Sequence, residues 1–344
     1  MTARPDEAES RRVRGRRRGV LSGKSSLSGR VTQVLGVRCR VEAGEKVLSA
    51  VPAKRLGHGV RGKKNLVAVG DEVKVADRPR GALIEEVLTR RNQLSRRMSF
   101  TGAEHVVAAN FDLLAVMLAP NPALNTGLLD RYLTAAFGQD FEVLILCNKK
   151  DLLDGPGVDR AMEPYAALGL PILRTCALTG EGVEAFKESA RGRWTVLVGH
   201  SGVGKTTWIN ALMPGLDLPV GEVDEERGKG RHTTERATAF RWQEDSLIVD
   251  TAGIREFSPY IMTPLEVENA FVEIHEAGGS CRYPNCLHET EPACGVKAAV
   301  ERGTVSGQRY RSYLRLMQEA RCRDPEDRPT EGKRPEDTGP FDED

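Results

Sequence analysis

The sequence predicts a multi-domain protein in which a small β-barrel of the OB-fold type precedes an α/β P-loop domain and a small helical zinc domain. Three observations lead to this prediction. Short β-type runs separated by turns fill residues 29–91, and apolar runs alternate with helical segments over residues 111–259. Three cysteines and one histidine then fall within fourteen residues, 281–294, of a helical C-terminal segment.

The composition is that of a globular protein. The chain has 344 residues, of which 40% are hydrophobic. No apolar run approaches the ~18 residues that a membrane-spanning helix needs. The arginines near the N-terminus precede no long apolar stretch, so we expect no secretory signal. The sequence therefore predicts a cytoplasmic protein that makes no membrane contact, and nothing in it suggests more than a monomer.

The net charge of +1 hides an uneven distribution. Residues 1–100 hold 24 Lys and Arg against 10 Asp and Glu, whereas residues 101–344 hold 26 against 39. A basic N-terminal third predicts a polyanionic partner, most simply nucleic acid. A solvated charged surface without a partner explains the same counts, so charge alone does not decide between the two.

The two ends of the chain are expected to lack regular structure. Residues 1–28 are rich in Arg, Gly and Ser without apolar periodicity, which predicts a disordered basic arm. This arm either contacts RNA transiently or only increases solubility. Residues 324–344 contain nine acids, three bases and four prolines, which predicts a disordered acidic tail with no function of its own.

Residues 29–98 are expected to form the barrel and to bind RNA. The β-type runs are Val31–Val37, Cys39–Val41, Lys46–Val51, Val67–Val69, Glu72–Val75 and Leu83–Val87. Basic residues accompany them: Lys54, Arg55, Arg61, Lys63, Lys64, Arg90, Arg91, Arg96 and Arg97. Because the stretch contains no aromatic residue before Phe100, we expect recognition of phosphates or shape, not base stacking.

Residues 105–259 are expected to form a parallel sheet with helices on both faces, because fully apolar strands alternate with helices. The expected strands are Leu113–Leu118, Glu142–Cys147, Ile172–Thr175, Trp194–Val198 and Leu247–Val249. The expected helices lie near residues 127–137, 157–168, 182–190 and 204–212. Residues 260–323 have a helical pattern that the cysteine cluster interrupts.

A phosphate-binding loop follows one of these strands. The segment matches GxxxxGK[ST] and reads Gly199-His200-Ser201-Gly202-Val203-Gly204-Lys205-Thr206, followed by Thr207. Its glycines allow backbone N–H groups to surround phosphates at the start of a helix. Lys205 is predicted to reach the β- and γ-phosphates, and the Thr206 hydroxyl to bind Mg²⁺.

A second element is predicted to sense the γ-phosphate. Asp250-Thr251-Ala252-Gly253 follows an apolar strand and matches DxxG. Asp250 would hold Mg²⁺ through water, and the Gly253 N–H would contact the γ-phosphate. The polar segment 221–235 contains Thr233 and Thr234, and a switch loop needs one threonine to complete the Mg²⁺ shell. The sequence does not choose between these two threonines.

The base site is predicted from Asn148-Lys149-Lys150-Asp151, an NKxD pattern after a strand. The Asp151 carboxylate would accept hydrogen bonds from guanine N1–H and the 2-amino group. Adenine lacks this pair of donors, so an ATPase is disfavoured. Lys149 would pack along the base. Cys176-Ala177 stands where GTPases usually have Ser-Ala, whose backbone N–H contacts guanine O6.

The order of these motifs is circularly permuted. Ordinary GTPases run from the phosphate loop through DxxG to NKxD, whereas here residues 148–151 and 176–177 precede residues 199–206 and 250–253. A circular permutation leaves the sheet unchanged where the N- and C-termini of the ordinary GTPase, which it joins, lie close together. The γ-phosphate sensor then leads directly into the C-terminal segment.

The cysteine cluster predicts one structural zinc site. Cys281, Cys286, His288 and Cys294 supply three thiolates and one imidazole, a full tetrahedral set without an open position. Free buried cysteines near a histidine are the alternative. A small helical domain, here residues 260–323, gains most from such a metal.

With these motifs, the chain resembles the bacterial ribosome small-subunit-dependent GTPase A family over roughly residues 29–322. Further matches are Arg90-Arg91-Asn92-Gln93-Leu94, Gly230-Arg231-His232-Thr233-Thr234 and Arg255-Glu256-Phe257. The resemblance implies an OB-fold, a circularly permuted GTPase domain and a zinc domain. It also implies binding to the 30S subunit and 16S rRNA, with a role late in small-subunit maturation. The chain has Ala252 where the family usually has proline, and Glu235 where it often has a third threonine.

Hydrolysis is expected to need help from the ribosome. Ile254 follows DxxG where many GTPases have a water-orienting glutamine, and an aliphatic side chain cannot orient water. His232 is the candidate inside the chain for this catalytic role, although packing or RNA contact would explain it equally well. The alternative function is a GTP-gated RNA-binding module with negligible turnover.

Overall fold

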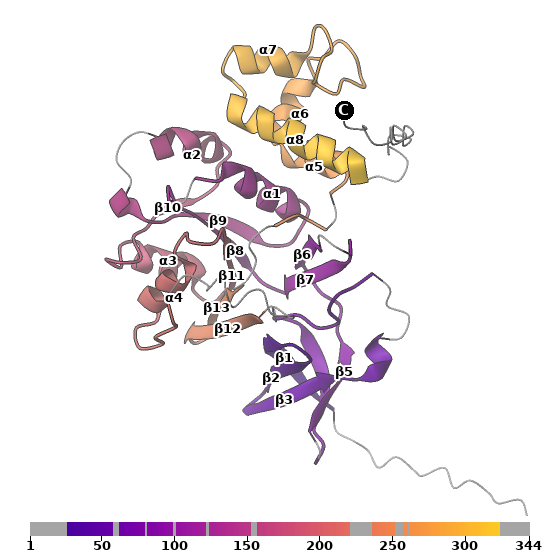
Figure 1. Ribbon diagram of the computed structural model, residues 1–344, viewed down its shortest axis with the longest axis vertical. Helices are drawn as coiled ribbons and strands as arrows, with labels where there is room; N and C mark the ends of the chain where they lie inside the picture. The colour runs from indigo at the N-terminus through magenta and orange to yellow at the C-terminus, as the bar shows by residue number, and fades with distance from the viewer. Residues whose placement is uncertain are drawn as a thin grey trace, which may run out of the picture.

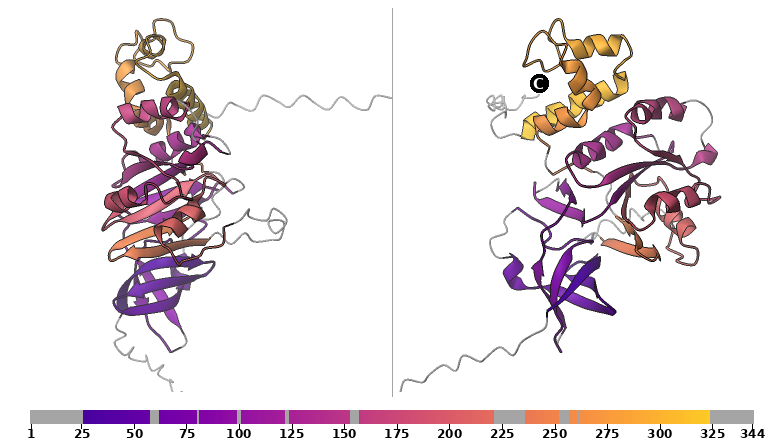
Figure 2. Two further views of the ribbon diagram at one scale, coloured as in Figure 1. Left: turned by 90° about the vertical axis from the view of Figure 1, so that its left-hand side faces the viewer. Right: turned by 180° about the vertical axis from the view of Figure 1, so that it is seen from behind.

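The computed structural model describes residues 26–57, 62–79, 81–98, 101–121, 124–152, 157–220, 236–251, 257–260 and 262–323. A barrel, an α/β domain and a helical domain follow one another along the long axis (Figures 1 and 2). Most of the expected arm and the whole expected tail lie outside the described residues. None of the described helices is both long and apolar enough to cross a membrane.

Five of the described strands close the barrel: β1 (Ser26–Leu35), β2 (Arg38–Ala43), β3 (Lys46–Pro52), β4 (Glu72–Ala76) and β5 (Ala82–Val87). Their order is β1-β2-β3-β5-β4, and β4 pairs back onto β1. β3 and β5 run parallel, whereas the other neighbours are antiparallel. A short 3₁₀ turn, η1 (Lys54–Gly57), follows β3. Buried valines and isoleucine fill the interior, so the predicted barrel is confirmed.

The barrel begins earlier than we expected. Ser26–Ser28, which we expect in the basic arm, belong to β1, where Leu27 pairs with Val75 of β4. Two serines flanking one apolar residue have too little β-propensity to predict a strand. Their extended structure comes from pairing with β4.

The expected strand at Val67–Val69 is wrong. Only Val69 makes a bridge, to Ala108, within this segment. The Asp71 carboxylate accepts the N–H of Ala68 at 2.8 Å, so this donor is not available to a ladder. A hairpin that we did not predict, β6 (Gln93–Arg97) with β7 (Glu104–Ala109), lies instead across the expected boundary between the barrel and the α/β domain.

The α/β sheet has the order β10-β9-β8-β11-β13-β12. Its strands are β8 (Leu113–Leu118), β9 (Glu142–Cys147), β10 (Ile172–Arg174), β11 (Trp194–Gly199), β12 (Arg236–Gln243) and β13 (Ser246–Asp250). All neighbours are parallel except β12, which is antiparallel to β13. The parallel strands agree with the prediction, whereas the more polar β12 was not predicted.

Helices cover both faces of this sheet, as predicted (Figure 1). Successive residues of β8 lie in two different hydrophobic cores, one on each face of the sheet. Leu114 and Val116 pack with α1 (Thr126–Ala136) and α2 (Gly157–Ala167). Leu113 and Met117 pack on the opposite face with α3 (Val183–Ala190) and α4 (Lys205–Leu212).

The sheet continues into the barrel. β12 pairs with β13 on one side and with β1 on the other, through Gln33–Thr238, Val34–Ala237 and Leu35–Arg236. Gln33 Nε2 donates to Thr238 Oγ1 at 3.1 Å. Eleven of the described strands therefore form a single sheet that spans two domains.

The C-terminal domain contains α5 (Pro264–Ala270), α6 (Val272–Gly278), α7 (Gly295–Glu301) and α8 (Gly307–Arg323). Thr263 and Glu266 form a capping box that starts α5. Phe271, Ile274, Tyr313 and Leu316 lie in the core that joins these helices.

This domain packs on the α/β domain through α1 and α8. The Arg309 guanidinium donates to Asp130 Oδ1 at 2.6 Å and to Glu273 Oε1 at 2.7 Å. The side chains of Arg309 and Asp130 are 1% and 0% exposed. Tyr165 also donates to Asp130 Oδ1, at 2.8 Å. Burial alone would lower the pKa of Arg309, but its bonds with Glu273 and Asp130 outweigh that effect and raise this pKa.

Candidate functional site

The predicted phosphate loop connects β11, in the middle of the sheet, to α4. A Cβ added to Gly199 would lie 2.4 Å from the Met117 carbonyl oxygen, so β8 passes too close for any side chain. Gly204 has a φ of +98°, and a Cβ there would lie 2.5 Å from the Asn148 amide nitrogen. These two glycines allow the tight turn that a phosphate loop requires.

Lys205 extends back across this loop. Its Nζ donates to the carbonyl oxygens of Gly199 at 2.7 Å and His200 at 2.9 Å. Burial lowers the pKa of Lys205 to about 8, although Asp250 opposes this effect. Burial likewise raises the pKa of Asp250, against the opposing charge of Lys205. The structure thus brings a cation and a carboxylate together in a desolvated position, which suits a phosphate and its metal ion.

Other loop residues lie around this pair. Ser201 and Gly202 are exposed, Val203 is buried, and His200 is half-buried. Thr206 and Thr207 are half-buried in the first turn of α4. Thr206 therefore lies on the helix turn where a P-loop threonine meets its metal ion.

Asn148 joins three loops of the predicted base site. This side chain is only 1% exposed. Its Nδ2 donates to the Val203 carbonyl oxygen at 2.8 Å, and its Oδ1 accepts the Ala177 N–H at 3.1 Å. Thr175 Oγ1 donates to the same oxygen at 3.3 Å. The NKxD turn, the Cys-Ala loop and the phosphate loop therefore form one hydrogen-bonded unit, and sequence analysis did not identify Thr175 as part of it.

The rest of NKxD is more exposed than Asn148. Lys149 has a φ of +61°, and its Nζ donates to the Asn121 carbonyl oxygen at 3.0 Å. Lys150 pairs with Glu181 of the neighbouring loop. Asp151, in the short 3₁₀ turn η2 (Lys150–Leu152), is exposed, and its Oδ1 accepts the Cys176 thiol at 3.2 Å.

Asp250 ends β13, beside the phosphate loop. Thr251, the next residue, donates its hydroxyl to the Leu197 carbonyl oxygen at 2.8 Å and so fixes the end of the strand. Gly253 and Ile254 lie outside the described residues, as does the switch segment with His232, Thr233 and Thr234. Their roles stay predictions.

Three of the four candidate ligand atoms in the cysteine cluster are spaced as in a tetrahedral metal centre. All four candidate ligand atoms lie within 4.8 Å of one another. Cys281 Sγ lies 3.8 Å from Cys294 Sγ, and each sulfur lies 3.5 Å from His288 Nδ1. Tetrahedral zinc with Zn–S bonds of about 2.3 Å and Zn–N bonds of about 2.0 Å requires edges of about 3.8 Å and 3.5 Å. The donor set therefore fits zinc, and a sulfur separation of 3.8 Å is far too long for a disulfide.

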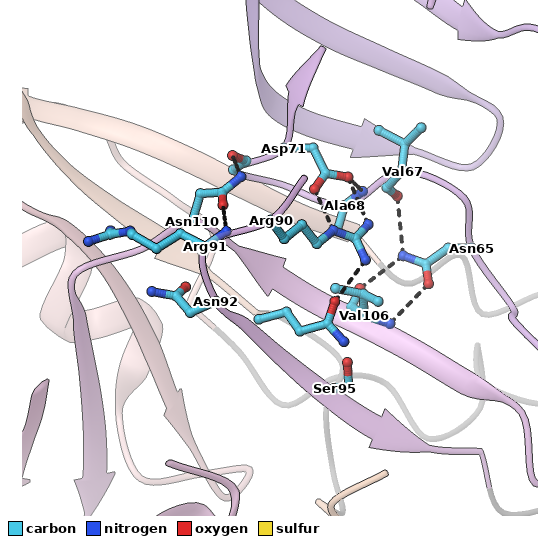
Figure 3. A network of polar contacts seen from close by, with 12 residues as sticks. Asn65, Val67, Ala68, Asp71, Arg90, Arg91, Asn92, Ser95, Val106 and Asn110 are labelled. Carbon is cyan, nitrogen blue, oxygen red and sulfur yellow. Dashed lines mark hydrogen bonds and ion pairs between the residues drawn. The ribbon is translucent and has the colours of Figure 1, made fainter. Parts of the chain in front are cut away.

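Arg90, one of the basic residues that accompany the barrel, has a structural role. It makes a bidentate contact with the fully buried Asp71, from Nε to Oδ1 at 2.7 Å and from Nη2 to Oδ2 at 2.9 Å (Figure 3). Its Nη1 also donates to Gln93 Oε1 at 2.9 Å. The guanidinium is therefore occupied by protein partners.

Comparison with known proteins agrees with this geometry. The sequence model of the family described as RsgA GTPase matches residues 87–259. A Bacteroides fragilis protein named small ribosomal subunit biogenesis GTPase RsgA is 39% identical over 267 residues, 76% of this chain and 86% of that protein. This chain belongs to the RsgA GTPase family. An Azotobacter vinelandii protein of the same name is 34% identical over 319 residues, 92% of this chain and 91% of that protein.

Solved structures support the fold of this RsgA-family chain. YjeQ from Thermotoga maritima has a TM-score of 0.65 at 29% identity, covering 86% of this chain and 98% of its own. YloQ, described as a circularly permuted GTPase, has a TM-score of 0.61 at 25% identity, covering 87% and 96%. The predicted family, the permuted order and the GTPase activity are thereby confirmed.

Proposed function

We propose that this GTPase is stimulated by the 30S subunit, binds 16S rRNA and acts late in small-subunit maturation. The observation that carries the proposal is the hydrogen-bonded unit around Asn148, which brings together motifs whose order in the chain is permuted. Relatives at 39% and 34% identity named for small ribosomal subunit biogenesis support the choice of partner. Such a partner lies in the cytoplasm, where we propose that the chain acts as a monomer.

Each candidate residue then has a role in binding GTP. We propose that Lys205 and the backbone of the phosphate loop hold the phosphates, and that Asp151 binds guanine. Thr206 and Asp250, with Thr233 or Thr234, would hold Mg²⁺, which neutralises charge on the phosphates. His232 is proposed to orient the attacking water, because Ile254 cannot do so.

The same proposal assigns a structural zinc ion to Cys281, Cys286, His288 and Cys294. The distances between their ligand atoms support a tetrahedral ion. Zinc would cross-link the segment between α6 and α7, which holds all four ligands. The C-terminal domain would then hold a fixed shape against the GTPase domain while it contacts the subunit.

Multiple-turnover phosphate release, measured with and without purified 30S subunits at fixed salt, tests the proposal. Subunits should increase release from the wild type and leave Lys205→Met at background. Release that subunits do not change would refute the proposal and favour the GTP-gated RNA-binding module. Excess ATP should not compete with GTP, and His232→Ala should lower the stimulated rate.

A further inference from the structure

The side chain of Cys176 contacts the predicted guanine-binding carboxylate. Its Sγ donates to Asp151 Oδ1 at 3.2 Å. Cys176 is 2% exposed, whereas Asp151 is exposed. The carboxylate therefore has a protein donor and is still open to solvent. From the sequence we expect only the backbone of this loop to contact the nucleotide.

The loop holds the thiol in place. The Cys176 N–H donates to the Glu181 carbonyl oxygen at 3.0 Å, and its own carbonyl oxygen accepts the Gly180 N–H at 2.9 Å. Both backbone groups are thus engaged, so the thiol position depends mainly on one side-chain torsion. The ion pair between Lys150 and Glu181 links the same loop to the NKxD turn. The donor and the carboxylate therefore belong to one braced unit.

We infer that the Cys176 thiol positions the Asp151 carboxylate so that both of its oxygens face guanine, and that Cys176 thereby sets the preference for a base with a 2-amino group. This inference rests on the proposed role of Asp151 in the GTP site. A carboxylate receives two parallel hydrogen bonds only when its plane matches that of the donors. A donor bonded to Oδ1 resists rotation of the Asp151 carboxylate. Cys176 is accordingly a positioning residue.

Guanine and hypoxanthine nucleotides separate this role from simple packing. GDP offers two donors to Asp151, whereas IDP lacks the 2-amino group and offers one. If the Asp151 carboxylate rotates out of the plane of the base, the two hydrogen bonds to guanine should weaken more than the single hydrogen bond to hypoxanthine. A packing defect in the loop would weaken both nucleotides by the same factor.

The experiment measures the dissociation constants of GDP, IDP and ADP by competition with a fluorescent guanine nucleotide, using the full chain with Mg²⁺. Cys176→Ala removes the donor, and Cys176→Ser replaces it with a hydroxyl donor. Cys147→Ala is the matched control, because that thiol is also 2% exposed but lies in β9. One lost hydrogen bond should weaken GDP binding of Cys176→Ala roughly three- to tenfold. IDP binding should change by less than about twofold, because its single bond survives rotation of the carboxylate.

Each result has one meaning. A lowered preference for GDP over IDP in Cys176→Ala, restored in Cys176→Ser and unchanged in Cys147→Ala, supports the inference. Equal losses for GDP and IDP, or no loss, overturn it while the guanine site stands. Wild-type protein that binds ADP as tightly as GDP would refute the guanine site itself, and the inference with it.

Discussion

Replacing Arg309 with methionine should destabilise the protein by about 3–5 kcal/mol, because it leaves a buried carboxylate without its cation. Asp130 is fully buried and receives the Arg309 guanidinium at 2.6 Å. Methionine fills a similar volume but donates nothing, so Asp130 keeps only the Tyr165 hydroxyl as a partner. Contact of the guanidinium with the Phe271 ring, 4.0 Å from its centroid, is also lost.

The chain provides a matched control at the same helix interface. Arg131 of α1 pairs with Glu319 of α8, and one of its nitrogens lies 2.7 Å from Glu319 Oε2. These side chains are 21% and 33% exposed, so solvent screens the pair. Arg131→Met should therefore cost no more than about 1 kcal/mol. The two variants remove the same type of group from the same interface and differ mainly in burial.

Urea unfolding followed by circular dichroism measures the difference. With a slope of about 2 kcal/mol/M, a loss of about 4 kcal/mol lowers the midpoint by about 2 M. Adding Asp130→Asn to Arg309→Met removes the unpaired charge and should recover about half of the loss. A midpoint for Arg309→Met equal to that of Arg131→Met would refute the reasoning, because burial would then not determine the cost.

Three further predictions concern the nucleotide and metal sites. GDP affinity should fall by up to about tenfold per pH unit above pH 8, because burial lowers the pKa of free Lys205 to about 8 and phosphate binding needs its proton. Calorimetry across pH 7–9.5 measures this, and a flat profile would contradict it. Gly204→Ala should lower GDP affinity at least about tenfold, since the new Cβ would lie 2.5 Å from an amide nitrogen at positive φ, whereas Gly157→Ala meets no atom within 4 Å. Elemental analysis should find one zinc per chain, lost in Cys294→Ala and kept when the exposed Cys322 is replaced by serine. Full zinc in Cys294→Ala would exclude that ligand.

Local patterns predicted the buried strands but not the polar ones. Leu113–Leu118 is apolar at every position because both of its faces are covered, so its bounds could be predicted to the residue. Gln93–Arg97 and Arg236–Gln243 contain charged and amide side chains, and their strand structure comes from their pairing partners, β7 for the first and β13 and β1 for the second. Neither carries a period that separates it from a loop.

The same distinction holds for the candidate site. Each nucleotide motif is a short local pattern, so its residues could be predicted individually. The contacts that join them could not, because Asn148 meets Val203 from 55 residues away in the chain. Arg309 and Asp130 are 179 residues apart. Pairing at such separations depends on the folded topology, which no local pattern encodes.

The pairing of β1 with β12 limits how this protein can be divided. A fragment that ends after the barrel would expose the backbone of Gln33–Leu35, which β12 covers in the whole chain. Unpaired strand edges promote association between molecules, so we expect an isolated barrel to aggregate or to exchange strands with its neighbours. Fragments for solution work should therefore keep β12 with β1, even though some 200 residues separate the two strands in the sequence.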